Sequence, residues 1–238
     1  MKNKRALPRI GIIGGAGPIA GLQLANHIIR ICQNKYQCVD DADFPYIMLL
    51  SFPFADMLTI DSGNSQRELL QKQLKECFET FSQHKISYAA IACNTLHEFL
   101  VPSPGIEFLH MIKETAEFLK KNEISRSINL CTETSSKTQL HRKFFNCEYP
   151  SVKDQAIVDE VIYRILGGNI RAEDSEKLAK IAAKFRKDEN TPLGIILGCT
   201  ELPLLNDKFP IDHFVKNCVI IDPMMIVAER LCKLVMNK

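Results

Sequence analysis

Short apolar runs alternate with amphipathic segments along almost the whole chain. The first run, Arg9 to Ile13, is rich in isoleucine and ends at Gly14-Gly15-Ala16-Gly17-Pro18, and a segment with apolar residues at helical spacing follows it. The same order of strand, turn and helix recurs to the C-terminus. The pattern predicts strands over residues 9–13, 44–52, 86–92, 106–111, 127–131, 193–197 and 218–221. It predicts helices over residues 19–34, 64–82, 112–121, 152–166, 172–186 and 224–236, with a further helix opening at 132–135.

Strands that alternate with helices are typical of the α/β class, in which parallel sheets carry helices on both faces. The clearest break is Pro102-Ser103-Pro104-Gly105, after which the pattern restarts. We therefore expect two pseudo-symmetric lobes, each a mostly parallel sheet flanked by helices. Residues 1–105 with 211–238 form the first expected lobe, and residues 106–210 form the second. The last strand and helix are assigned to the first lobe because the two sheets then have comparable numbers of strands.

Small and polar residues gather where the predicted strands end. In α/β folds ligands bind beyond the carboxyl ends of the strands. Four turns fall at such ends: Gly14–Gly17, Cys93–Thr95, Thr132–Ser135 and Cys199–Glu201. We expect them to form one active site in the cleft between the two lobes.

Composition limits the class of protein. The 238 residues are 46% hydrophobic and 24% charged, with a formal net charge of +2, as in soluble globular proteins. This balance indicates no nucleic-acid partner and no membrane-binding patch, and no apolar run approaches the roughly 20 residues needed to span a bilayer. Nine cysteines without CxxC spacing favour reduced thiols over a disulfide framework or a zinc ribbon. No signal peptide is visible, so we expect a cytoplasmic protein.

Cys93 and Cys199 each follow directly after a predicted buried strand. A thiolate can act as a nucleophile, a metal ligand or a general base. Neither turn offers a second cysteine or histidine at metal-ligand spacing. His97, four residues after Cys93, is either a base that would activate a nucleophilic Cys93 or a residue that only caps or packs. A purely structural role for both buried cysteines is a further alternative.

Two-base proton transfer is the remaining chemical option. One cysteine, as thiolate, removes a proton from one face of a carbon, and the other, as thiol, donates a proton to the opposite face. Both cysteines precede predicted helical turns, whose backbone N–H groups favour an anion. Those N–H groups, together with the side chains of Asn94, Thr95 and Thr200, would hold a carboxylate and stabilise a carbanion.

Four segments, spread from the first predicted strand to the last helix, match one known family. They are Ile10-Gly11-Ile12-Ile13-Gly14-Gly15-Ala16-Gly17-Pro18, Ala92-Cys93-Asn94-Thr95-Leu96-His97, Leu197-Gly198-Cys199-Thr200-Glu201-Leu202-Pro203 and Ile221-Asp222-Pro223-Met224. In these segments the chain resembles the aspartate/glutamate racemase family, most closely its aspartate racemase branch. Because the segments cover nearly the whole chain, they are specific together, although the first alone would not be.

The resemblance implies a cofactor-independent amino-acid racemase. It assigns Cys93 and Cys199 as the paired acid and base on either side of the α-carbon of a small amino-acid substrate. It implies that Asn94, Thr95 and Thr200 hold the α-carboxylate or the ammonium group, and that the first glycine turn approaches the substrate with its backbone. It also implies a homodimer. The residues expected to line the substrate site are Gly15, Ala16, Asn94, Thr95, Thr132, Ser135, Thr200 and Glu201.

The chain departs from the family pattern in three turns. Ala16 stands where the family usually has methionine. In the second-lobe turn Thr134 replaces a glycine and Glu133 adds a charge. The segment Pro53-Phe54-Ala55-Asp56-Met57 lacks the arginine with which aspartate-specific members often pair the side-chain carboxylate, and the next arginine is Arg67. Aspartate or glutamate is the expected substrate, with a different amino acid as the alternative.

Three other functions compete with racemisation. The first glycine turn is a candidate dinucleotide-binding turn, but its spacing is not GxGxxG and no acidic residue follows at the end of a second strand. A decarboxylase or cis–trans isomerase of the same superfamily would use one cysteine, and this chain has both. A non-catalytic amino-acid-binding protein of the same fold remains an alternative.

Overall fold

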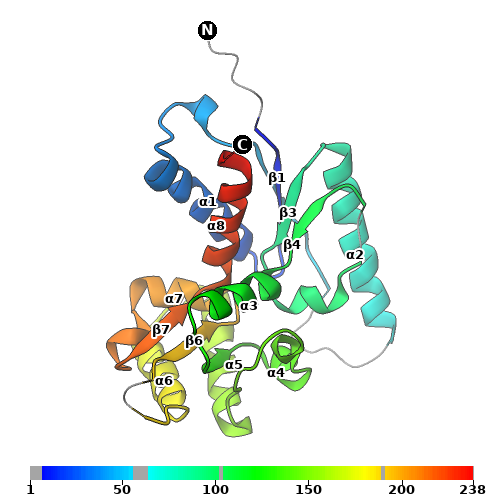
Figure 1. Cartoon of the computed structure of the whole chain (residues 1–238). Coiled ribbons are helices and arrows are strands. Elements are labelled where there is room, and N and C mark those ends of the chain that lie inside the picture. Colours follow the sequence, from blue (N-terminus) through cyan, green and yellow to red (C-terminus); the bar gives the residue numbers. More distant parts are fainter. Residues whose placement is uncertain (1–6, 56–63, 102–103, 189–190, 238) are drawn as a thin grey trace. The chain divides into compact units, whose positions relative to one another are not determined.

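The structure, a computed structural model, describes residues 7–55, 64–101, 104–188 and 191–237. Two compact units make up the chain (Figure 1). Among the described residues, the first unit comprises 7–55, 64–101, 104–111 and 224–237, and the second comprises 112–188 and 191–223. Both are α/β, so the predicted fold class is confirmed.

The first unit is built on a four-stranded sheet with the order β2-β1-β3-β4, and every pairing in it is parallel. The pairs Ile10↔Ile47 and Ile10↔Tyr88 place β1 at the centre of the sheet. Its elements are β1 (Ile10–Gly14), α1 (Ala20–Tyr36), β2 (Ile47–Ser51), α2 (Asn64–Gln83), β3 (Tyr88–Ile91), β4 (Glu107–Leu109) and α8 (Pro223–Met236), with short 3-10 helices at Asp41–Asp43 and Thr95–Phe99.

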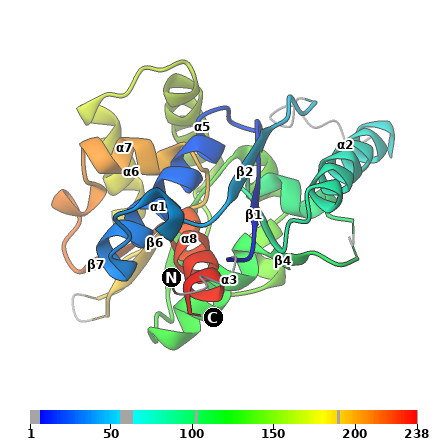
Figure 2. The same cartoon turned by 90° about the horizontal axis from the view of Figure 1, so that it is seen from above.

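Helices cover both faces of this sheet. Ile10 and Ile12 of β1 are fully buried in one apolar cluster with α1 and α8. On the opposite face, Gly11 faces α2 so closely that a Cβ there would lie 2.6 Å from the Phe81 ring. Figures 1 and 2 both show the strands between α1 and α8 on one side and α2 on the other. Since β1 is buried from both faces, its residues form a continuous apolar run rather than an alternating one.

The second unit contains a three-stranded parallel sheet with the order β5-β6-β7. Ile128 pairs with Ile195, and both belong to an apolar cluster that α5, α6 and α7 cover. Its elements are α3 (Met111–Lys121), β5 (Ser127–Leu130), α4 (Glu133–Lys137), a 3-10 helix at Leu140–Lys143, α5 (Val152–Leu166), α6 (Ala172–Ala183), β6 (Leu193–Leu197), α7 (Leu202–Lys208), a 3-10 helix at Ile211–His213 and β7 (Cys218–Ile221).

Two strands lie in sheets other than the predicted ones. β4 pairs with β3 through Tyr88↔Glu107 and completes the first sheet, although the prediction places 106–111 in the second lobe. β7 pairs with β6 through Leu193↔Cys218 and completes the second sheet, although the prediction places 211–238 in the first lobe. In each case the strand lies beside the strand that precedes it in sequence, as a short crossover favours. An equal number of strands in each sheet is not a physical requirement.

No helix in the described part of the chain is long and apolar enough to cross a membrane. All nine cysteines are free thiols.

The packing of α8 in the first unit can be tested with Leu231, which has no exposed surface. Leu231→Ala would leave a cavity in the apolar cluster and should lower the free energy of unfolding by about 2–5 kcal/mol. Met225→Ala on the same helix is the control, because Met225 is 36% exposed and should change it by less than about 0.5 kcal/mol. Urea denaturation followed by circular dichroism measures both. Equal losses in the two variants would contradict the assigned packing.

Candidate active site

The first cysteine turn lies at the carboxyl edge of the first sheet. Cys93 comes two residues after β3 ends at Ile91, and it is 8% exposed. The backbone N–H of Ala92 donates to the Ile13 carbonyl at 2.8 Å, which ties this turn to the end of β1. The Cys93 turn and the glycine turn after β1 therefore leave neighbouring strands at the same edge, as predicted.

The glycine turn has a backbone that only glycine adopts easily. Gly15 has φ of +96°, and a Cβ there would lie 2.0 Å from the carbonyl oxygen of Phe52. Gly17 is also left-handed, with φ of +82°. Ala16 between them is 9% exposed. The chain thus turns sharply at the end of β1 and presents backbone at the edge where Cys93 lies.

Asn94 and Thr95 follow Cys93 and are both nearly buried. They lead into the 3-10 helix Thr95–Phe99, which corresponds to the predicted helical turn. The contacts of His97 on this helix do not support a role as a catalytic base. Its Nδ1 lies 2.8 Å from the Cys93 carbonyl oxygen, and its Nε2 accepts a hydrogen bond from the Met111 backbone N–H at 3.1 Å. Because the backbone engages both ring nitrogens, we assign His97 a structural role.

The second cysteine turn contains a thiol–carboxylate pair. Cys199 comes two residues after β6 ends, and its Sγ donates to Oε2 of Glu201 at 2.9 Å. The Thr200 hydroxyl donates to the same oxygen at 3.3 Å. All three side chains are nearly buried. In this arrangement the carboxylate of Glu201 orients the side chain of Cys199.

Burial raises the pKa of Glu201, and this outweighs the opposing effect of the hydrogen bonds that its carboxylate accepts. No cation is paired with Glu201 among the described residues. The thiol of Cys199 and the hydroxyl of Thr200 therefore provide the polar contacts of a carboxylate that is shielded from water. Thr200 and Glu201 are thus brought together with Cys199, as predicted.

The turn after β5 lies beside the Cys199 turn. The Cys199 backbone N–H donates to the Leu130 carbonyl at 3.2 Å, which joins the ends of β6 and β5. Thr132 caps α4: its Oγ1 accepts from the Ser135 backbone N–H at 3.4 Å and donates to Ser135 Oγ at 3.3 Å. The hydroxyls of Thr132 and Ser135 therefore lie at the same edge as Cys199.

Sequence reasoning missed Asn129, which lies under the Cys199 turn. Asn129 is fully buried, and neither its Oδ1 nor its Nδ2 has a hydrogen-bond partner among the described residues. A Cβ on Gly198 would lie 1.9 Å from Asn129 Oδ1, so the asparagine side chain fills the space that the glycine leaves. The sequence signal is an asparagine between two apolar residues inside a predicted strand.

The structure thus gives two half-sites, one at the carboxyl edge of each sheet. Cys93 lies with the glycine turn and Asn94-Thr95 in the first unit, and Cys199 lies with Thr200, Glu201 and the Thr132 turn in the second. That the two meet in a cleft stays a prediction. Within residues 7–55, 64–101, 104–188 and 191–237, no three potential ligands gather where they could hold a metal ion.

Comparison with known proteins decides the family. The model of the Asp/Glu/hydantoin racemase family matches residues 13–231. The chain belongs to this family. Racemases are isomerases, so the predicted family and enzyme class are confirmed.

The chain is similar to several known racemases. The broad specificity amino-acid racemase RacX of Bacillus subtilis is 24% identical over 92% of this chain and 95% of its own length. A glutamate racemase of Actinobacillus pleuropneumoniae is 22% identical over 91% of this chain and 78% of its own length. The structure of Picrophilus torridus aspartate racemase matches with a TM-score of 0.71 at 23% identity, over 95% of this chain and 93% of that one. At such identity the structural match supports the fold alone.

The segment that should select the racemase substrate is only partly described. Pro53, Phe54 and Ala55 are placed, whereas Asp56 and Met57 lie outside the described residues. The next arginine, Arg67 of α2, interacts with Glu98 and Phe99. Its Nη2 lies 3.3 Å from Oε1 of Glu98, its Nη1 donates to the Glu98 carbonyl at 3.3 Å, and its guanidinium lies over the Phe99 ring.

Gly15 of the glycine turn offers a matched test of backbone crowding. Gly15→Ala should destabilise the protein by more than about 2 kcal/mol, because the new Cβ meets the Phe52 carbonyl and the φ is left-handed. Gly168→Ala is the control. Its φ is +80° but nothing lies within 4 Å, so only the strain of about 1 kcal/mol remains. Thermal denaturation compares the two, and equal losses would contradict the close approach of Phe52.

The buried carboxylate of Glu201 should make stability depend on pH. Because its pKa is raised on folding, the folded protein binds the proton more tightly, and stability falls as pH rises above the ordinary value of 4.5. Glu201→Gln removes this loss. Its stability relative to wild type should therefore be greater at about pH 7 than at about pH 4. Urea denaturation at both pH values measures this.

Glu117→Gln, at an exposed position on α3, is the control for this test. It should show no such pH-dependent gain. If Glu201→Gln behaved in the same way as this control, the raised pKa of Glu201 would be refuted.

Proposed function

We propose that the protein is a cofactor-independent amino-acid racemase in which Cys93 and Cys199 transfer the α-proton. The observation that carries the proposal is the Cys199–Glu201 contact of 2.9 Å, in which a thiol at the carboxyl end of a central strand holds its proton against a buried carboxylate. A second thiol, Cys93, occupies the corresponding place after β3 in the other unit. Membership of a racemase family supports the same assignment.

The proposed reaction conserves protons without a cofactor. Starting from the state in which Cys199 is a thiol, Cys93 as thiolate takes the proton from the α-carbon, and the electron pair of the broken C–H bond is delocalised into the α-carboxylate. Cys199 then donates its proton to the opposite face and becomes the thiolate. The reverse turnover, or proton exchange with water, restores the first state.

In this proposal Glu201 positions the thiol of Cys199 and the substrate is held by neutral donors. Asn94 and Thr95 lie beside Cys93, and Thr132, Ser135 and Thr200 lie beside Cys199. Fixed amide and hydroxyl dipoles need no reorganisation when negative charge develops on the carboxylate, so they stabilise the carbanion more than water would.

Other thiols are poor candidates for the acid–base pair. Burial raises the pKa of Cys77 to about 12 and that of Cys147 to about 11. It raises the pKa of Cys131 well above its ordinary value. These groups stay protonated at neutral pH and cannot serve as base. Since all nine cysteines are free, a reducing compartment is suitable, and the proposal places the protein in the cytoplasm as a homodimer.

Aspartate or glutamate is the proposed substrate, because these are the amino acids in the name of the matched Asp/Glu/hydantoin racemase family, and the relatives include a glutamate racemase. A racemase of another amino acid is the second candidate. The ion pair between Arg67 and Glu98 favours this candidate. Arg67 already pairs with a carboxylate of the protein, whereas an aspartate or glutamate substrate would need an arginine for its own side-chain carboxylate. The likeness to the broad specificity amino-acid racemase RacX points in the same direction.

Proton exchange in D₂O tests the mechanism. The wild-type protein, incubated with L-aspartate, L-glutamate and a panel of other L-amino acids, should convert at least one of them to a racemic mixture deuterated at the α-carbon. Cys93→Ala and Cys199→Ala should each lower racemisation by a factor of about a hundred to ten thousand. Any residual exchange should be confined to one enantiomer, and that enantiomer should differ between the two variants. Circular dichroism and proton NMR follow the two readouts.

Cys218→Ala is the matched control, because Cys218 is half-buried and donates to the Val215 carbonyl near the start of β7. It should retain racemisation. If the wild-type protein exchanges the α-proton of no amino acid in the panel but binds one of them saturably, the racemase proposal is refuted. The protein would then be a non-catalytic amino-acid-binding protein. Full activity in either catalytic variant would refute the two-cysteine mechanism.

A further inference from the structure

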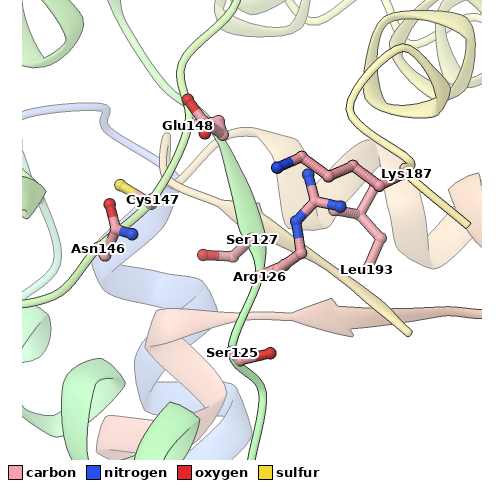
Figure 3. A pocket seen from close by; sticks show the side chains of 8 residues that line it. All are labelled: Ser125, Arg126, Ser127, Asn146, Cys147, Glu148, Lys187 and Leu193. Carbon is pink, nitrogen blue, oxygen red and sulfur yellow. The ribbon is translucent and has the colours of Figure 1, made fainter. Parts of the chain in front are cut away.

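A cavity lies within the second unit, at the opposite edge of the sheet from Cys199. Its volume is about 240 Å³, and Figure 3 shows the side chains that line it. Ser127 begins β5 and Leu193 begins β6, so the cavity opens at the amino ends of both strands. Cys199 follows the carboxyl end of β6, roughly 15 Å away along a five-residue strand. The cavity is therefore no part of the proposed active site.

Two cationic side chains line this cavity, and neither forms an ion pair with a carboxylate of the described residues. Arg126 and Lys187 both reach it (Figure 3). Arg126 donates one Nη2 hydrogen bond to the Phe185 carbonyl at 2.8 Å, and Lys187 forms no hydrogen bond or ion pair with any described residue. The carboxylate in the lining, Glu148, lies 3.4 Å from Arg142 and is compensated by it. The lining therefore has an excess of positive charge.

A buried hydroxyl in the lining also lacks a partner. Ser127 is only 3% exposed, and its side chain makes no hydrogen bond with any residue in the described ranges. It lines the cavity. An oxygen-rich ligand in the cavity would satisfy this hydroxyl while it neutralises the two cations.

We propose that this cavity binds a small multivalent oxyanion, with inorganic phosphate and short dicarboxylates as the two sources of that chemistry. Lys187 supplies a point charge, the free N–H groups of Arg126 supply planar donors, and Ser127 supplies a neutral donor. A monovalent anion would leave part of the positive charge uncompensated, so the site should prefer divalent ones.

Isothermal titration calorimetry of the full-length protein tests this site. Phosphate and succinate are titrated separately at constant ionic strength, with chloride as the monovalent comparison. We expect saturable binding of phosphate, succinate or both, and none of chloride. Lys187→Gln should weaken binding about tenfold, the equivalent of about 1.4 kcal/mol. Because Lys187 is exposed and forms no hydrogen bond or ion pair with any described residue, this variant should fold normally.

Lys120→Gln is the control, since it removes one exposed positive charge from α3 of the same unit, away from the cavity lining. It should bind as wild type does. Two results would overturn the proposal. One is the absence of saturable binding for both divalent anions. The other is binding that Thr132→Ala abolishes and Lys187→Gln leaves unchanged, because the anion would then occupy the cysteine edge of the sheet.

Discussion

Parallel strand pairing is the constraint on which the rest of this structure depends. In both sheets every pairing between described strands is parallel, so helices must connect the strands and cover the faces. Strands such as Ile10–Gly14 and Leu193–Leu197 are then buried throughout and consist of apolar residues and glycine. Reactive groups have no place inside such strands. They are confined to the turns at the strand ends, where Cys93 and Cys199 lie.

Close backbone approaches then set the shape of those turns. Gly15 lies against the Phe52 carbonyl and Gly198 lies against the Asn129 side chain, and neither position has room for a Cβ. The edges of the sheets are thereby fixed by close packing, against backbone at Gly15 and against a buried side chain at Gly198. Cys199 gains a further restraint from the carboxylate of Glu201. A proton-transfer group needs this kind of fixed geometry, because small displacements cost rate steeply.

Periodicity in the sequence was sufficient to predict the strands, the helices and the polar turns. The apolar runs that predict strands at 193–197 and 218–221 coincide with β6, which is buried throughout, and with β7, which is partly buried. Sheet membership was less predictable, because pairing is non-local and the run at 218–221 carries no mark of its partner.

The contacts within the candidate site were also hidden from the sequence. That His97 is held by the backbone depends on Met111, fourteen residues away. That Asn129 lies under Gly198 depends on two strands that are far apart in sequence. The motif Cys199-Thr200-Glu201 is local, but its direction of hydrogen bonding follows from a burial that only the fold creates. Local pattern therefore locates the candidate residues, and tertiary packing decides what each contacts.

The position of α8 also affects how the protein is made in the cell. The helix packs into the first unit although it follows the whole second unit in the sequence, and Val227, Leu231 and Val235 have no exposed surface there. During synthesis from the N-terminus, residues 224–236 are made after the whole second unit, so α8 covers the apolar face of the first sheet late. The second unit is complete in sequence before α8 is made. Until α8 is made, the nascent chain exposes apolar surface of the first unit, and such surface is prone to aggregation.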